Sequence, residues 1–307
     1  MKRELLLAEF LATPWALMPE RLNALAAVFG RWARNEPAGK EILERVMADR
    51  EARQVKRQAA QSAAGNGIAV LPLYGVVTQR GNMVDDVSGP GTTSTQMFGA
   101  ALSQALADDS VGQILIDIDS PGGSVYGVAE LADQIQSARA AKPVVAIANS
   151  LAASAAYWVG CAAGELYVTP GGEVGSIGVW QAHFDYSQAL ATDGVKPTLI
   201  AAGKYKVEGN PYEPLDEEAR GFMQSRVDDY YGAFTKAVAK GRSQPIASVR
   251  EGMGQGRVLG ADAALEQKMV DGIATFDDVI SMMQKRGRAQ SRATSRLTQA
   301  RNTLALI

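Results

Sequence analysis

The stretch ILIDIDSPGGS, residues Ile114 to Ser124, decides the fold of this 307-residue chain. Its first five residues form an apolar run interrupted only by Asp117, which is typical of a buried strand in a parallel sheet. Ser120-Pro121-Gly122-Gly123 then predicts a tight turn whose missing side chains expose backbone N–H groups. Such N–H groups can bind the charge that develops on a carbonyl oxygen during acyl transfer. A plain strand-to-helix turn is the alternative interpretation.

The residues around this stretch alternate between helical and strand patterns. We expect helices over Met97–Ala107, Val125–Ala138, Ala153–Ala162 and Asp216–Lys240. We expect strands over Ile68–Val77, broken by Pro72, and over Val144–Ala148 and Leu166–Thr169. Strands that alternate with helices indicate an α/β fold with a parallel sheet and right-handed crossovers.

A second stretch, NSLAASAAYW at residues Asn149 to Trp158, has the character of a nucleophile site. Small residues on both sides of Ser154 would let a polypeptide substrate approach its hydroxyl closely. The apolar run that begins at Tyr157 can anchor a helix beneath the serine. The sequence therefore predicts Ser154 as a nucleophile at a strand-to-helix junction.

The sequence favours a lysine over a histidine as the general base. The chain has one histidine, His183, in an ordinary stretch where a structural role is expected. Burial can lower the pKa of a lysine from about 10.4 toward neutrality, and the neutral amine can accept the serine proton. The stretch GKYKVEGNP holds two lysines, Lys204 and Lys206. Period-2 alternation would put both on one face of an extended segment, so the residues alone leave both open.

Four blocks between Gly67 and Asp278 resemble the S49 serine peptidases, the signal-peptide-peptidase-A-like Ser-Lys proteases of the ClpP/crotonase superfamily. They are DIDSPGGS from Asp117, the Ser154 block, EVGSIGV from Glu173, and Tyr205-Lys206 followed by Pro211. Each block alone is a weak match, but their order and spacing together are specific. The resemblance implies a ClpP/crotonase-like fold of repeated ββα units.

The resemblance also implies a role for each site residue. The Tyr-Lys-x-x-x-x-Pro pattern favours Lys206 as the base and leaves Lys204 as a solvated surface charge. Ser176 matches the family's serine that hydrogen-bonds and orients the lysine. The backbone N–H groups of Ala155 and Gly123, with Gly122 as a close candidate, would form the oxyanion hole.

The composition of the chain limits which partners and cofactors are expected. The chain is 47% apolar with a net charge of −2, which argues against nucleic acid as the main partner except through its basic tail. Cys161 is the only cysteine, so no intrachain disulfide is possible, and its small neighbours predict a buried thiol in the helix after Ser154. We expect no metal and no nucleotide cofactor, because the Gly-Gly turn lacks the context of a phosphate loop.

The N-terminal region predicts a protein without a membrane anchor. Glu4, Glu9 and Pro14 interrupt the only signal-like apolar run, and no stretch reaches the ~18 to 20 apolar residues that span a bilayer. This departs from the membrane-anchored signal peptide peptidases and predicts a cytoplasmic location, in the host cytoplasm or the phage procapsid. The segment TPWALMPERLNAL, residues 13 to 25, resembles the start of phage capsid S49 proteases.

We expect three parts along the chain: a helical, loosely attached extension over residues 1–64, the S49 peptidase domain over 65–284, and a basic, disordered tail over 285–307. Residues 80–95 are rich in turn formers and predict either a functional lid or a mobile connector. The tail has three interpretations: solvated disorder, docking to an acidic scaffold or DNA, and self-cleavage.

The functional hypothesis is a serine endopeptidase with a Ser-Lys dyad that processes phage capsid scaffold or portal-associated proteins during head maturation. A soluble bacterial housekeeping peptidase and a non-catalytic capsid-assembly module are the alternatives. A half-length S49 chain also implies a ring-like homo-oligomer, because in the family the serine and lysine often meet across a boundary. Preference for small or apolar residues before the cleaved bond follows from the resemblance alone.

Overall fold

The computed structural model describes residues 13–18, 67–80 and 92–289. The strands are β1 (Trp15–Leu17), β2 (Ile68–Tyr74), β3 (Val76–Thr78), β4 (Thr92–Ser94), β5 (Gln113–Ser120), β6 (Gly122–Ser124), β7 (Val144–Ala153), β8 (Glu165–Val168), β9 (Glu173–Gly175), β10 (Val258–Gly260) and β11 (Gly272–Ile273). The helices are α4 (Thr95–Ala107), α5 (Val128–Ala138), α6 (Ala155–Gly160), α7 (Ser187–Thr192), α8 (Glu217–Gly241), α9 (Ile246–Glu251) and α10 (Ala261–Glu266), and residues 276–289 are also helical.

The larger sheet has the order β10-β9-β7-β5-β2, with β8 pairing with β7 and β11 with β8. Every pair in it is parallel except β10 with β9. All residues of β5 are buried except the half-buried Asp119, because this strand lies in the middle of the sheet. The α/β fold with a parallel sheet, expected from the alternation of patterns, is confirmed.

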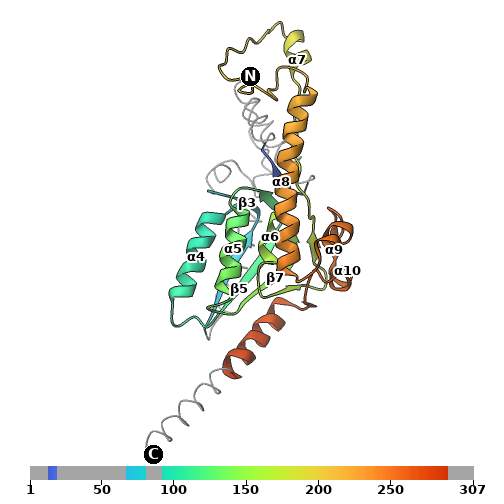
Figure 1. The fold of residues 1–307 in the computed structure, drawn as a ribbon. Coiled ribbons are helices and arrows are strands. Elements are labelled where there is room, and N and C mark those ends of the chain that lie inside the picture. Colours follow the sequence, from blue (N-terminus) through green and yellow to red (C-terminus); the bar gives the residue numbers. More distant parts are fainter. Residues whose placement is uncertain (1–12, 19–66, 81–91, 290–307) are drawn as a thin grey trace, which may run out of the picture.

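The two faces of this sheet have different coverings. Ile114, Ile116 and Ile118 of β5 face the core shared with α4, α5, α6 and α8, which lie together on one side in Figure 1. Leu115, the alternate residue, packs instead with Val279 and other residues near the C-terminal helix. The period-2 alternation of a strand thus divides one apolar run between two cores.

The smaller sheet has the order β1-β6-β3-β4 and stands next to the carboxyl ends of β2 and β5. Its middle strand β3 follows β2 after Gly75, and β6 follows β5 after Pro121. Both β2 and β5 therefore continue into a short strand of the second sheet before the chain reaches the next helix. This repeated strand-strand-helix unit is the one that the resemblance implied.

An arm, defined as residues 187–229, projects beyond the sheets in Figure 1. It contains α7, the segment joining α7 to α8, and the N-terminal part of α8. The C-terminal part of α8 is held by the body, where the Tyr230 ring meets Tyr126 edge-on with centroids 6.2 Å apart and Phe234 stacks on Trp158 with centroids 4.7 Å apart. In contrast, α7 has no buried residue, and Ile200 in the joining segment is 96% exposed.

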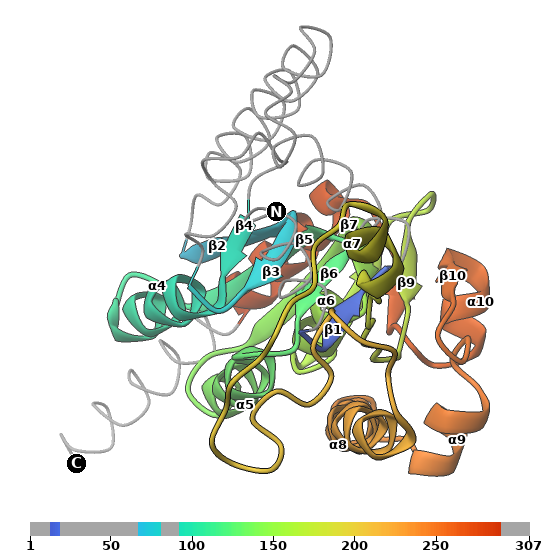
Figure 2. The same cartoon turned by 90° about the horizontal axis from the view of Figure 1, so that it is seen from above.

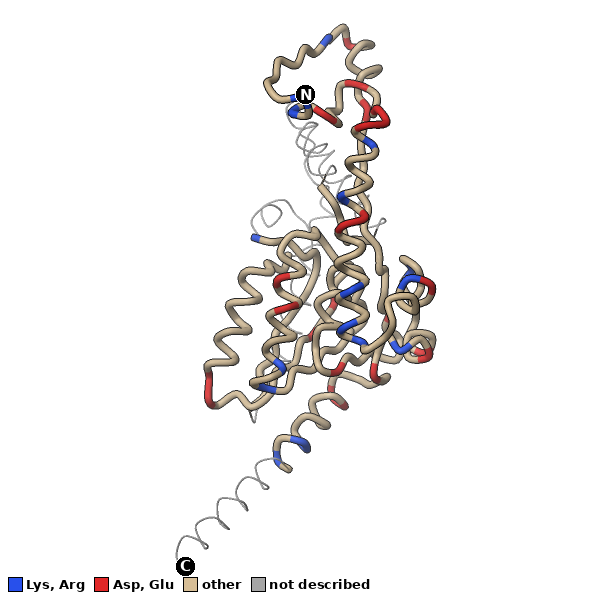
Figure 3. Tube along the Cα trace, in the orientation of Figure 1, with Lys and Arg blue, Asp and Glu red and all other residues tan. Residues whose placement is uncertain are grey.

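The start of α8 explains why a long helix can project in this way. The Asp216 carboxylate accepts a hydrogen bond from the Ala219 N–H at 2.7 Å, and Glu217 and Glu218 lie in the first turn. Figure 3 shows these acidic residues gathered where α8 begins. Negative charge at a helix N-terminus interacts favourably with the helix dipole, so this acidic start favours the helix.

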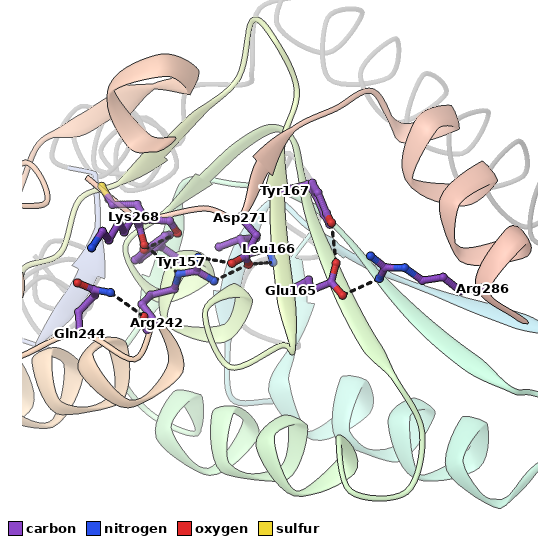
Figure 4. A network of polar contacts seen from close by, with 10 residues as sticks. Tyr157, Glu165, Leu166, Tyr167, Arg242, Gln244, Lys268, Asp271 and Arg286 are labelled. Atoms are coloured by element: carbon purple, nitrogen blue, oxygen red, sulfur yellow. Dashed lines mark hydrogen bonds and ion pairs between the residues drawn. The ribbon is translucent and has the colours of Figure 1, made fainter. Parts of the chain in front are cut away.

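The opposite end of α8 is held by an ion pair between the buried Arg242 and the more exposed Asp271, drawn in Figure 4. The Arg242 guanidinium donates to both carboxylate oxygens of Asp271 at 2.7 and 2.8 Å, and to the Lys268 carbonyl at 3.2 Å. Asp271 also accepts the Leu166 N–H of β8 at 2.7 Å. Burial raises the pKa of Asp271, but the bonds from Arg242 and Leu166 outweigh burial and hold that pKa below its ordinary value. The network ties α8 to the edge of the larger sheet.

Several predicted boundaries were wrong. Pro72 does not break its strand, because β2 lies at the sheet edge and tolerates a missing donor; the break falls at Gly75, with φ 70°. Gly122 and Gly123 belong to β6 rather than to a tight turn, so the following helix begins at Val128.

Two predictions about the ends of the chain also need correction where the structure describes them. Residues 13–18 contain the strand β1 and not a helix, and residues 285–289 continue a helix instead of starting a disordered tail. Arg286 in that helix pairs with Glu165 at 2.6 Å. The other residues of the predicted helical extension, and residues 81–91 of the predicted lid or connector, lie outside the described residues.

Candidate active site

Ser154 lies between the end of β7 and the start of α6, at the predicted strand-to-helix junction. Its φ of 56° and ψ of −120° are unusual for a residue with a side chain. The Ser154 N–H donates to the Gly175 carbonyl of β9 at 2.7 Å, and the Ser154 carbonyl accepts the Trp158 N–H at 2.9 Å. These bonds on both sides hold the serine in a strained conformation of the kind found at active sites.

The surroundings of Ser154 keep it buried and its hydroxyl unpaired. Ser154 is 1% exposed, and its Oγ has no hydrogen-bond partner among the described residues. Beneath it, Tyr157 donates its hydroxyl to the Met269 carbonyl at 2.9 Å, and Trp158 stacks on Phe234. A buried polar atom without a hydrogen-bond partner costs folding free energy and therefore needs an explanation. A functional role would explain it, which makes this hydroxyl a candidate reacting group.

The Gly122-Gly123 backbone packs directly against the serine. A side chain at Gly122, where φ is 98°, would place its Cβ 2.8 Å from Ser154 Cβ. A Cβ at Gly123 would lie 1.9 Å from the Val77 carbonyl oxygen of β3. Only glycine fits at either position, so both residues bring bare backbone to Ser154.

One oxyanion candidate is already paired. The Gly122 N–H donates to Ser120 Oγ at 3.2 Å, and the Ser120 hydroxyl donates to the Gly75 carbonyl at 2.6 Å. Gly122 is therefore the poorer candidate donor, because its N–H is bonded to a side chain two residues before it. The positioning role of Ser120 was not foreseen from sequence, because a serine before Pro-Gly-Gly is equally common in ordinary turns.

Ala155 and Ser176 lie beside Ser154 along the chain and across the sheet. Ala155 is the fully buried first residue of α6, where backbone N–H groups have no partner within the helix. Ser176 directly follows Gly175, whose carbonyl binds the Ser154 N–H, and is 8% exposed with φ 53°. The structure thus gathers Ser154, the two glycines, Ala155 and Ser176 at the carboxyl ends of neighbouring strands.

Lys206 is not part of this cluster within one chain. It lies in the segment joining α7 to α8, at the far end of the arm in Figure 1. Its side chain is exposed, and its ammonium makes no ion pair or hydrogen bond with another described residue. The predicted dyad is therefore not assembled in a single protomer.

The rival lysine has a different environment. The Lys204 ammonium pairs with Glu218 Oε1 at 2.8 Å and donates to the Tyr205 hydroxyl at 2.8 Å. These contacts, with the Glu218 bond foremost, raise the pKa of Lys204. A raised pKa favours the ammonium form, which cannot accept a proton, so Lys204 is the poorer candidate base.

Two other reactive side chains are occupied elsewhere. Cys161 is buried, as expected, and burial raises the pKa of its thiol to about 12. His183 contacts the Asn210 carbonyl through Nε2 at 3.0 Å, outside the serine cluster. Among the hydrogen bonds of the described residues, none joins Cys161 or His183 to Ser154.

The comparison with known proteins identifies the family. The sequence model of the family described as Peptidase family S49 matches residues 136–290, which include Ser154, Ser176 and Lys206. The chain belongs to peptidase family S49. It thus falls in a family of serine peptidases, and the resemblance deduced from four sequence blocks is confirmed.

Two phage proteins are among the similar relatives. Capsid assembly protease C of Escherichia phage lambda is 36% identical over 80% of this chain and 55% of its own length. Head-tail preconnector protein GP5 of Enterobacteria phage P21 is 37% identical over 74% of this chain and 45% of its own length. The S49 chain thus spans about half the length of these two relatives.

A cellular relative is more distant. The putative signal peptide peptidase SppA of Enterococcus faecium is 27% identical over 73% of this chain and 65% of its own length. Within the described ranges of the S49 chain, no helix has the length and apolar character needed to cross a bilayer.

Proposed function

We propose that this S49 chain is a serine endopeptidase in which Ser154 is the nucleophile and Lys206 the general base. The observation that carries the proposal is the buried, unpaired hydroxyl of Ser154, held on a strained junction against a backbone that only glycine can supply. Gly123 and Ala155 donate their N–H groups to the oxyanion, and Ser176 orients the lysine.

The reaction has two acyl-transfer steps. Lys206 Nζ, as a neutral amine, accepts the Ser154 proton while Oγ attacks the peptide carbonyl carbon. The oxyanion is held by the two backbone donors, and loss of one such donor costs about 2.7 to 4 kcal/mol of transition-state stabilisation. The lysine then passes its proton to the leaving amine. Water hydrolyses the resulting ester by the same route and regenerates the serine.

The lysine of each site comes from a neighbouring subunit of a homo-oligomer. Lys206 is exposed on an arm that also exposes apolar side chains, among them Ile200 at 96% and Phe222 at 58%. An arm of this kind is an expected protein contact surface. Its burial against a neighbour would remove water from Lys206 and favour the neutral amine, as the mechanism requires.

The substrates are proteins of a phage head. The two phage relatives, named as a capsid assembly protease and a head-tail preconnector protein, support a role in processing scaffold or portal-associated proteins. The reaction would then take place in the host cytoplasm or the procapsid. A housekeeping peptidase would instead digest cellular polypeptides without such a preference, and an assembly module would cut none.

The test is hydrolysis of an unfolded protein by the wild type, Ser154→Ala, Lys206→Ala and the matched control Lys204→Ala. We expect Ser154→Ala and Lys206→Ala each to lose activity by about a thousandfold or more, and Lys204→Ala to retain it. Mixing Ser154→Ala with Lys206→Ala should restore activity, because a mixed oligomer contains sites with both intact groups. Full activity in Ser154→Ala alone would refute the mechanism.

The mixing experiment also tests how the site is assembled. Restored activity requires the serine of one chain to meet the lysine of another. If both variants are inactive alone and remain inactive after dissociation and reassembly together, the dyad lies within one chain and the subunit arrangement proposed above is wrong. Inactivity of every chain, including the wild type, would favour the assembly module.

A further inference from the structure

The segment Thr13–Met18 lies along the candidate active site, between β6 and Trp180; β1 and β6 are seen together near α6 in Figure 2. Its strand β1 pairs antiparallel with β6, with Ala16 opposite Gly123. On its other edge, the N–H and carbonyl of Trp15 exchange hydrogen bonds with Trp180 at 2.8 and 3.0 Å. The segment is thus held on both edges, as an extended peptide is held in a groove.

The segment is also fully buried and bonded beyond its central residue. Trp15, Ala16 and Leu17 are 3%, 0% and 1% exposed. The Trp180 indole donates Nε1–H to the Leu17 carbonyl at 2.9 Å, and the Met18 N–H donates to the Pro121 carbonyl at 3.2 Å. These contacts link the segment to both walls of the site.

The pattern of these bonds fixes which way the Ala16 carbonyl points. Along a strand, successive residues direct their N–H and carbonyl to opposite edges. Trp15 directs both groups to Trp180, so Ala16 directs both to β6, and the bond from Met18 to Pro121 two residues later agrees. In such a pair the Gly123 N–H, the candidate oxyanion donor, faces the Ala16 carbonyl oxygen.

Ser154 lies next to the Ala16 carbonyl. The Cβ of a side chain built at Gly122 would be 2.3 Å from the Ala16 carbonyl oxygen and 2.8 Å from Ser154 Cβ. The Ala16 carbonyl oxygen and Ser154 Cβ therefore both border the small space that a methyl group on Gly122 would fill. An extended peptide whose carbonyl lies between an oxyanion donor and a nucleophile has the arrangement of a bound substrate.

We propose that Thr13–Met18 is a substrate-like strand that fills the peptide groove of its own chain, with Ala16 in the place of the residue that is acylated. This rests on the proposed function for the reaction, but the filling of the groove rests on the contacts alone. The free groove accepts an extended polypeptide antiparallel to β6, with a small side chain at the Ala16 position. External substrates therefore compete with the chain's own segment.

The bond presented to Ser154 is Ala16–Leu17. When a lysine reaches the site, Oγ forms an ester with the Ala16 carbonyl carbon, the Ala16–Leu17 C–N bond breaks, and the Leu17 amine leaves with the serine's proton. Water then hydrolyses the ester to an Ala16 carboxylate and restores the hydroxyl. The products are residues 1–16 and a chain that begins at Leu17.

The first arm of the test measures binding without catalysis. A labelled peptide with the sequence of residues 10–22, FLATPWALMPERL, is titrated into full-length Ser154→Ala and into the double variant Ser154→Ala, Ala16→Asp. The buried aspartate should expel the segment, so we expect the double variant to bind the peptide at least tenfold more tightly. Equal binding by both chains, or binding by neither, would overturn the proposal.

Two variants control for misfolding and for charge. Trp15→Pro removes the N–H that bonds Trp180 without adding charge, and in the Ser154→Ala background it should expose the groove as Ala16→Asp does. Ala140→Asp places the same charge at an exposed position after α5 and should bind no more peptide than Ser154→Ala alone. A peptide that itself carries Ala16→Asp should bind to none of these chains.

The second arm measures cleavage with Ser154 intact. The Ala16→Asp chain should cut the added peptide between Ala16 and Leu17, read by mass, and its KM for an unrelated extended peptide should be at least tenfold below that of the wild type. Cleavage of the peptide at another bond would overturn the assignment of Ala16. Tight binding in the first arm with no cleavage by any chain would leave the filled groove standing and refute the proposed peptidase activity.

Discussion

Replacing Gly122 by alanine tests how closely the backbone, the serine and β1 are packed. At φ 98°, an alanine is strained, and we expect that alone to cost about 1–3 kcal/mol of folding free energy. The new Cβ would also lie 2.3 Å from the Ala16 carbonyl oxygen and 2.8 Å from Ser154 Cβ, distances that force a displacement. Overpacking of this kind costs typically about 1–3 kcal/mol more.

Gly256 provides a matched control because its φ is 92° and a Cβ there would meet nothing within 4 Å. Gly256→Ala should therefore show the strain of the backbone without the clash. Urea unfolding at one protein concentration, followed by tryptophan fluorescence, gives both free energies. We expect Gly122→Ala to be the less stable variant by about 1–3 kcal/mol. Equal stability of the two variants would refute the close packing deduced at the nucleophile.

Two further predictions concern groups away from the site. Asp271→Asn leaves the buried Arg242 unpaired and should cost about 2–3 kcal/mol, less than a fully buried pair because the Asp271 side chain is 38% exposed. Folding lowers the pKa of Asp271, so this group contributes its full stabilisation above its unfolded pKa near 3.9 and loses it as the pH falls through the lower folded pKa. The unfolding free energy of Asp271→Asn should therefore not show this decrease at low pH. Cys161, with a thiol pKa of about 12, should react with a thiol reagent at pH 8 only after denaturation, and rapid labelling of the native chain would contradict its burial.

Local pattern was enough to predict much of the fold. The run Ile114–Ile118 is a buried strand and Thr95–Ala107 is a helix because their apolar spacing alone specifies which side must be covered. The position of Ser154 at the end of a strand could be predicted for a similar reason, since only small residues flank it. These features depend on neighbours in sequence, and the pattern of side chains contains that information.

Features set by distant partners could not be predicted in this way. Pro72 sits within a strand because β2 is an edge, and a strand's place in a sheet is a property of the whole topology. The pairing of Trp15–Leu17 with β6 joins segments far apart in the chain. The placement of Lys206 on the arm depends on where α8 ends its contact with the body, so no local pattern could relate this lysine to Ser154.

The manner in which α8 is attached makes it a lever. Its pivot is the end that carries Tyr230, Phe234 and Arg242, while the part from Glu217 to Asp229 extends beyond the described body for about 20 Å at a rise of roughly 1.5 Å per residue. A rotation of about 5° at the pivot would then swing the tip by roughly 2 Å. A misplacement of about 1 Å can slow a reaction about a hundredfold. Under the proposed mechanism, a small change in how Phe234 packs would therefore displace Lys206 enough to change greatly the reaction rate at the Ser154 of a neighbouring subunit.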